Sequence, residues 1–99
     1  MSGYVIVDIE VRDPKQYERY KELAPPAIAA YGGKYIARGG KVTVLEGDWN
    51  PKRCVILEFP SAAQAVAWWN SPEYTAARKV RQECASANMI VVEGLAAPV

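Results

Sequence analysis

The stretch YVIVDIEV, residues 4–11, constrains the fold of this chain more than any other. Its side chains alternate with a period of two, as they do along a β-strand. One face is wholly aliphatic and belongs in a core: Val5, Val7, Ile9 and Val11. The opposite face begins with Tyr4 and Ile6 before it turns polar. A strand that is apolar on both faces needs cover on both sides.

A helix follows this strand. Asp13 suits its N-cap and Pro14 its first turn. Apolar residues then recur at helical intervals: Tyr17, Tyr20, Ala24, Ala27, Ile28 and Tyr31. Pro25 and Pro26 predict a kink or break near Ala24, because each proline removes a helical hydrogen bond. Gly32 is placed to cap the C-terminus.

Residues 33–46 have the pattern of one bent strand, with Gly39 and Gly40 at the bend. Turn residues 47–51 follow, and 52–59 read as the returning strand. The predicted register sets Glu46 opposite Arg53, Val44 opposite Val55 and Val42 opposite Leu57, all on one side of the hairpin. The other side receives Thr43, Leu45, Cys54, Ile56 and Glu58.

Ser61 and Ser71 predict the starts of two further helical segments, the second with Pro72 at its first position. A last strand is expected over 88–94. Residues 1–95 therefore form one expected domain, and 96–99 an expected frayed tail.

The order strand, helix, strand, strand, helix, strand is that of an α+β ferredoxin-like fold, whose helices cover one face of a four-stranded antiparallel sheet. The uncovered face is predicted to carry apolar residues: Tyr4, Ile6, Leu45, Cys54, Ile56 and either Met89 or Ile90. A contiguous apolar patch indicates an interface. We therefore expect a two-fold homodimer in which two sheets pack face to face and close a barrel.

The amino-acid composition argues against several classes of function. Twelve basic and eleven acidic residues give a net charge of +1, which argues against nucleic-acid and membrane-surface partners. The basic run RKVR, residues 78–81, fits the solvated face of a helix whose inner side carries Val80. The N-terminal segment has neither the pattern of a signal peptide nor that of a membrane span. The chain has no histidine and only two cysteines, Cys54 and Cys84. We therefore expect a reduced cytoplasmic protein with no metal and no cofactor.

Four strings also resemble those of a known family. GGKYIARGG, LEGDWNPKR, EFPS and WWNSPEY, in this order, are similar to the signature strings of a bacterial family catalogued as a domain of unknown function, in the dimeric α/β-barrel superfamily. The resemblance runs from about residue 4 to 94 and implies a ferredoxin-like fold with a sheet-to-sheet dimer. Relatives in the superfamily include cofactor-free oxygenases, isomerases and haem proteins. This chain lacks the histidine typical of the haem-binding members.

Several residues are candidates for a site. Arg38 lies beside two glycines and offers a fork that fits a carboxylate, or alternatively pairs with Glu46 or Glu58 to fix the bend. Glu46 and Arg53 are expected to pair across the hairpin, either as a structural pair alone or as part of a pocket lining in which Glu46 is a proton-transfer candidate. Glu58, inside VILEF, is expected to be paired or to have a raised pKa suited to proton transfer.

The aromatic residues offer a second group of candidates. Tyr20, Trp68 and Tyr74 would line a pocket between helices and sheet, with Tyr74 as a further proton-transfer candidate, although helical spacing also fits a plain core. Asp8 and Glu10 are more simply solvated or paired at the rim of the barrel.

Two functions stay open. One is a cofactor-independent isomerase or monooxygenase acting on a small aromatic or carboxylated metabolite, with Arg38 as its anion anchor. The other is a non-catalytic dimer that binds a small ligand or serves as a scaffold.

Overall fold

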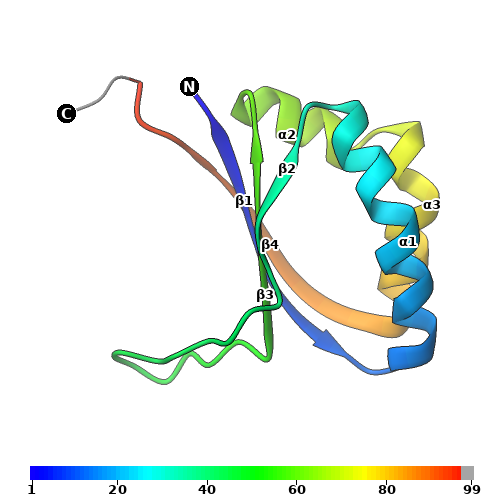
Figure 1. Ribbon diagram of the computed structural model, residues 1–99, viewed down its shortest axis with the longest axis vertical. Helices are drawn as coiled ribbons and strands as arrows, with labels where there is room; N and C mark the ends of the chain where they lie inside the picture. The colour runs from blue at the N-terminus through cyan, green and yellow to red at the C-terminus, as the bar shows by residue number, and fades with distance from the viewer. Residues whose placement is uncertain (97–99) are drawn as a thin grey trace.

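The computed structural model describes residues 1–96. The elements in chain order are β1 (Gly3–Val11), α1 (Pro14–Ala30), β2 (Lys34–Arg38), β3 (Arg53–Phe59), α2 (Ala62–Trp69), α3 (Pro72–Cys84) and β4 (Ala85–Glu93). The strands form one antiparallel sheet in the order β2-β3-β1-β4. All three helices cover one face of it (Figure 1). The ferredoxin-like α+β fold is therefore confirmed. No helix of residues 1–96 is both long and apolar enough to cross a membrane.

The helix ends follow the sequence. Asp13 caps α1 by accepting a hydrogen bond from the Gln16 amide at 3.2 Å. Ser61 and Ser71 cap α2 and α3 in the same way. At the end of α1, Gly32 adopts φ 76°, and the amides of Gly32 and Gly33 donate to the carbonyls of Ala29 and Ile28. These two bonds form a Schellman motif, which needs a residue with positive φ.

The expected break near Ala24 is wrong, because α1 runs unbroken from Pro14 to Ala30 with both prolines inside it. The prolines leave the carbonyls of Lys21 and Glu22 without their helical donors. Packing compensates for this loss, since Ala24, Ala27 and Ile28 are buried against the sheet and the other helices.

The predicted hairpin register is also wrong. Tyr35 faces Leu57 and Arg38 faces Val55, so residues 42–46 have no partner on β3. The pairing ends where the Gly39 amide donates to the Cys54 carbonyl at 2.9 Å. Gly39 then adopts φ 72° and turns the chain away. Residues 39–52, here called the arm, project from the sheet on the side away from the helices (Figure 1).

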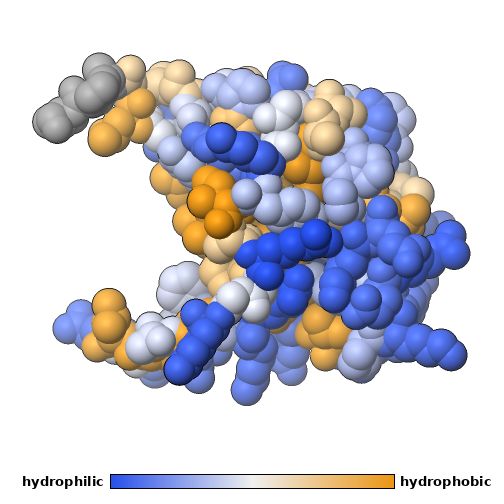
Figure 2. Space-filling view, viewed as in Figure 1, coloured by the Kyte–Doolittle hydropathy of each residue, from blue (hydrophilic) through white to orange (hydrophobic). Residues whose placement is uncertain are grey.

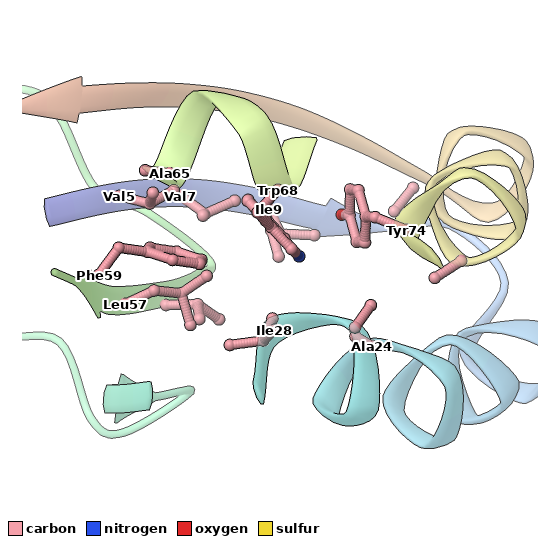
Figure 3. Packing of buried hydrophobic residues seen from close by; sticks show 14 of the residues in the cluster. Val5, Val7, Ile9, Ala24, Ile28, Leu57, Phe59, Ala65, Trp68 and Tyr74 are labelled. Atoms are coloured by element: carbon pink, nitrogen blue, oxygen red, sulfur yellow. The ribbon is translucent and has the colours of Figure 1, made fainter. Parts of the chain in front are cut away.

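The core lies between the helices and the aliphatic face of β1. Val5, Val7 and Ile9 are almost fully buried, and the largest fully buried side chains are those of Trp68, Tyr74 and Phe59 (Figure 3). The aliphatic face predicted for residues 4–11 therefore faces the core, as expected.

The prediction for the run at 78–81 needs a correction. The buried stripe of α3 consists of Tyr74, Ala77, Arg81 and Cys84, so the inward residue of that run is Arg81 and not Val80. Val80 lies one position, about 100°, away from this stripe on the helix.

The opposite face of the sheet carries a row of isoleucines. Ile6 of β1 faces Ile56 of β3 and Ile90 of β4, and Tyr4 next to it faces Val92. Ile90 is 56% exposed and Val92 42%. Met89, the other residue considered for this face, packs instead against the core. We call this surface the open face. In Figure 2 it forms a hollow between the arm and the C-terminal end of β4, with apolar atoms on its wall. The expected frayed tail, 96–99, lies outside the described residues except for Ala96.

Candidate functional site

A narrow cavity lies between α1, α2 and the covered face of the sheet. Its volume is about 20 Å³, room for roughly one water molecule. Apolar and aromatic side chains form most of its wall: Val7, Ile9, Tyr17, Tyr20, Ile28, Tyr35, Val55, Leu57, Trp68 and Met89. Its charged lining residues are Lys21, Arg38 and Arg53. No residue lining the cavity in the described part of the chain carries a carboxylate.

Arg38 lines the cavity from β2, the strand at one edge of the sheet. Its guanidinium lies 4.4 Å from the centre of the Tyr35 ring, a cation–π distance. Its Nη2 donates to the Lys21 carbonyl at 3.2 Å. That carbonyl is one of the two that the prolines of α1 leave without a helical donor. The expected ion pair of Arg38 with Glu46 or Glu58 is absent among residues 1–96.

Arg53 lies on the cavity side of β3. Its Nε donates to the Tyr17 hydroxyl at 3.2 Å. The expected pair with Glu46 is therefore wrong, because the arm leaves β3 before residue 46 can reach it. Gly39 makes room for this guanidinium, since a Cβ at position 39 would collide with it. Neither Arg53 nor Arg38 has a carboxylate partner within the described residues.

Two tyrosine hydroxyls meet beside the cavity. The oxygens of Tyr20 and Tyr74 are 2.8 Å apart, and Tyr74 is fully buried. Burial and the neighbouring Tyr74 raise the pKa of Tyr20 well above its usual range. Tyr20 is therefore a neutral hydroxyl, which can take part in hydrogen bonds at the edge of the cavity.

Trp68 presents an unpaired donor. Its side chain is 1% exposed, and its ring packs between Phe59 and Tyr74 at centroid distances of 5.2 and 4.3 Å. Its Nε1 has no hydrogen-bond partner in the part of the chain that the structure describes. A buried donor left without an acceptor costs about 1–3 kcal/mol. In Figure 3 this nitrogen points away from α2 toward α1.

The predicted glutamates lie elsewhere. Glu58 lies on the open face, opposite Tyr4, where it accepts from the Ser2 hydroxyl at 2.8 Å and pairs with Lys34 at 3.4 Å. The Ser2 hydrogen bond, with help from Lys34, lowers its pKa, so the pairing alternative is confirmed and the raised pKa is wrong. Glu46 lies on the arm and lines a separate hollow with Trp49 and Cys54. Catalytic roles for Glu46 and Glu58 stay predictions.

Asp8 also lies on the open face. It accepts a hydrogen bond from Trp49 Nε1 at 2.9 Å and so ties the arm to β1. Glu10 is exposed near the end of the same strand.

Four of the five residues predicted to bind a ligand line the cavity: Tyr20, Arg38, Arg53 and Trp68. The fifth, Tyr74, contacts it through the Tyr20 hydroxyl. Sequence reasoning missed Tyr17, Lys21 and Tyr35 as lining residues. Tyr17 and Lys21 are four residues apart and so share a helix face with Tyr20, which was the available signal.

Comparison with known protein families shows which family the chain belongs to. A family model described as "Domain of unknown function (DUF1330)" matches residues 2–95. The chain belongs to the DUF1330 family. A comparison of this DUF1330 chain with curated proteins gives no match.

Solved structures share the fold of this DUF1330 protein. A protein of unknown function from Rhodopseudomonas palustris is 25% identical with a TM-score of 0.74, over 95% of this chain and 82% of that one. A dimeric ferredoxin-like protein of unknown function from Thermobifida fusca is 17% identical with a TM-score of 0.65, over 94% and 91%. SnoaB, a cofactor-independent oxygenase from Streptomyces nogalater, is 8% identical with a TM-score of 0.63, over 97% and 95%.

Proposed function

We propose that this DUF1330 protein is a homodimer that binds a small aromatic carboxylate in the cavity between its helices and its sheet. The observation that carries the proposal is the pair of guanidinium groups, Arg38 and Arg53, which line a mostly apolar cavity and have no carboxylate partner in residues 1–96, whereas the third charged lining residue, Lys21, pairs with Glu18. An arginine fork binds a carboxylate with two parallel hydrogen bonds.

The cavity walls favour a ligand with a planar apolar body. Three tyrosines and one tryptophan line the cavity together with aliphatic side chains. Aromatic rings pack well against such walls in offset or edge-to-face arrangements. Because the cavity has room for roughly one water, a ligand of this size binds only if side chains that line it, Arg38 among them, move apart. Arg38 is an exposed residue on an edge strand, so its movement leaves the core intact.

The open face supports the homodimer. Its isoleucine row, Ile6, Ile56 and Ile90, spans three neighbouring strands without cover from the helices. The arm adds Leu45, which is 95% exposed, and Trp49. A second copy brings the same apolar row and buries both by two-fold symmetry. The dimeric state of the Thermobifida fusca protein, which shares the fold, supports this arrangement.

A second candidate function is cofactor-independent chemistry on the bound ligand, either isomerisation or oxygenation. The Tyr20–Tyr74 hydroxyl pair favours it, because it places a hydroxyl at the cavity that can donate a hydrogen bond to negative charge developing on the ligand. SnoaB shares this fold and is a cofactor-independent oxygenase, so the fold is compatible with such chemistry. For this candidate, Tyr74→Phe should reduce conversion of a carboxylate substrate while leaving its binding in place.

Calorimetry with two matched ligands tests the binding proposal. Benzoate and benzamide have nearly the same shape, but only benzoate carries a charge. We expect benzoate to bind more tightly, and Arg53→Gln to remove most of that difference. Arg78→Gln is the control, because Arg78 stacks on Trp69 at 4.3 Å and does not line the cavity. Equal binding of both compounds, or no binding of either, would contradict the proposal.

A further inference from the structure

The unpaired indole of Trp68 and the two arginines reach the cavity from different elements. Arg38 and Arg53 come from β2 and β3, at one side of the sheet. Trp68 comes from α2, which packs mainly over β1 and β4 at the other side. All three side chains line the same cavity. Since strands are spaced about 4.8 Å apart, β1 lies roughly 10 Å from β2. A ligand that contacts the arginines and Trp68 together must span a distance of this order.

An indole N–H only donates, so it needs an acceptor. Trp68 Nε1 has none in residues 1–96 and is enclosed by protein. The ring cannot turn away to find one, because Phe59 and Tyr74 pack on it. The nearby Tyr20 hydroxyl is engaged with Tyr74. The cavity that Trp68 lines has room for roughly one water molecule, so this donor is completed by a water or by a ligand oxygen that takes the water's place.

We propose that the Trp68 N–H recognises an oxygen on the end of the ligand opposite its carboxylate. The ligand class is then a small aromatic acid that carries a hydroxyl or carbonyl oxygen across the ring from the acid group. This inference rests on the proposed function, since the arginines hold the carboxylate end. Trp68 sets specificity, whereas Arg38 and Arg53 set the requirement for an anion.

Two probes of the same size test the inference. 4-Hydroxybenzoate and 4-methylbenzoate differ only in the group across the ring, and only the hydroxyl accepts a hydrogen bond. We expect 4-hydroxybenzoate to bind roughly three- to tenfold more tightly, the ratio that one neutral hydrogen bond supplies. In Trp68→Phe the two probes should bind equally. The control Trp69→Phe should keep the preference, because Trp69 does not line this cavity.

Indole N–H signals in nuclear magnetic resonance spectra provide a readout that does not depend on the folding of Trp68→Phe. The chain has three tryptophans, and Trp49→Phe and Trp69→Phe identify the Trp68 signal by elimination. 4-Hydroxybenzoate should move the Trp68 signal downfield, and 4-methylbenzoate should not.

Three outcomes are distinguishable. A preference for 4-hydroxybenzoate that moves the Trp68 signal supports the inference. Equal binding of the two probes, with no difference at the Trp68 signal, overturns the inference and leaves the carboxylate cavity standing. Binding of neither probe overturns both.

Discussion

Arg38 donates a hydrogen bond to the carbonyl oxygen of Lys21 at 3.2 Å, and this carbonyl is the one that Pro25 deprives of its helical donor. A residue of β2 thus completes the hydrogen bonding of α1. The same side chain lines the candidate cavity. Arg38 therefore has a structural role in the empty protein, and ligand binding must compete with it.

Replacing Arg38 tests this relationship. Arg38→Ala should lower the free energy of unfolding by about 1–2 kcal/mol, since it removes a charged hydrogen bond and a cation–π contact. In a Pro25→Ala background, where residue 25 again donates to Lys21, the same substitution should cost about 1 kcal/mol less. Urea denaturation of the four proteins of this cycle measures the coupling. Strict additivity would show that the Lys21 contact contributes nothing.

The glycine pair of the arm offers a matched comparison. Gly39→Ala should destabilise the protein by roughly 1–2 kcal/mol, because Gly39 has φ 72° and a Cβ there would strike the Arg53 guanidinium. It should also weaken benzoate binding by displacing Arg53 from Tyr17. Gly40→Ala is the control, since its Cβ would meet open space. Thermal denaturation and calorimetry report the two effects, and similar results for both variants would be unexpected.

The lowered pKa of Glu58 predicts an acid-sensitive contribution to stability. The Ser2 hydroxyl and Lys34 hold this pKa below its ordinary value of 4.5 in the folded chain. The unfolded chain then binds a proton at a higher pH than the folded chain. The contribution is therefore fully present above pH 4.5 and is lost as the pH falls through the folded pKa.

Unfolding curves collected from pH 7 to pH 3 check this prediction. Glu58→Gln should flatten the loss of stability at acid pH, and Ser2→Ala should lessen it. Glu46→Gln serves as the comparison, because Glu46 is exposed on the arm and has no ion pair in the described chain. A wild-type profile identical to that of Glu58→Gln would refute the assignment.

Local sequence patterns correctly predicted the features that depend on residues close together in the chain. The caps at Asp13, Ser61 and Ser71 and the end at Gly32 form as expected, because each depends on backbone groups within three or four residues. The alternation of side chains along β1 correctly predicted which of its faces packs in the core and which belongs to the open face. The order of these elements was enough to fix the fold class.

Features that depend on distant residues were harder to predict. The β2–β3 register failed because Gly39 can bend within a strand or leave it, and only the three-dimensional pairing decides between these. The prediction of a helix break near Pro25 failed because Arg38, thirteen residues away, donates the hydrogen bond that the Lys21 carbonyl loses to the proline. Arg81 turned inward, although arginine usually lies on the surface.

The candidate site was predicted in part. Tyr20, Arg38, Arg53 and Trp68 were selected as ligand-binding residues from their chemistry and spacing, and the structure places all four around one cavity. The orphaned Trp68 donor could not be predicted, because it depends on which acceptors the folded chain leaves out of reach.

The central claim is that a second copy of the chain covers the open face. The association state of the protein in solution tests this claim most directly. In sedimentation equilibrium at micromolar concentration, the wild-type protein should have twice the mass of one chain. Ile6→Glu, in the middle of the isoleucine row, should shift it toward the monomer, whereas Lys15→Glu, on the exposed side of α1, should not. A wild-type protein with the mass of one chain would contradict the account.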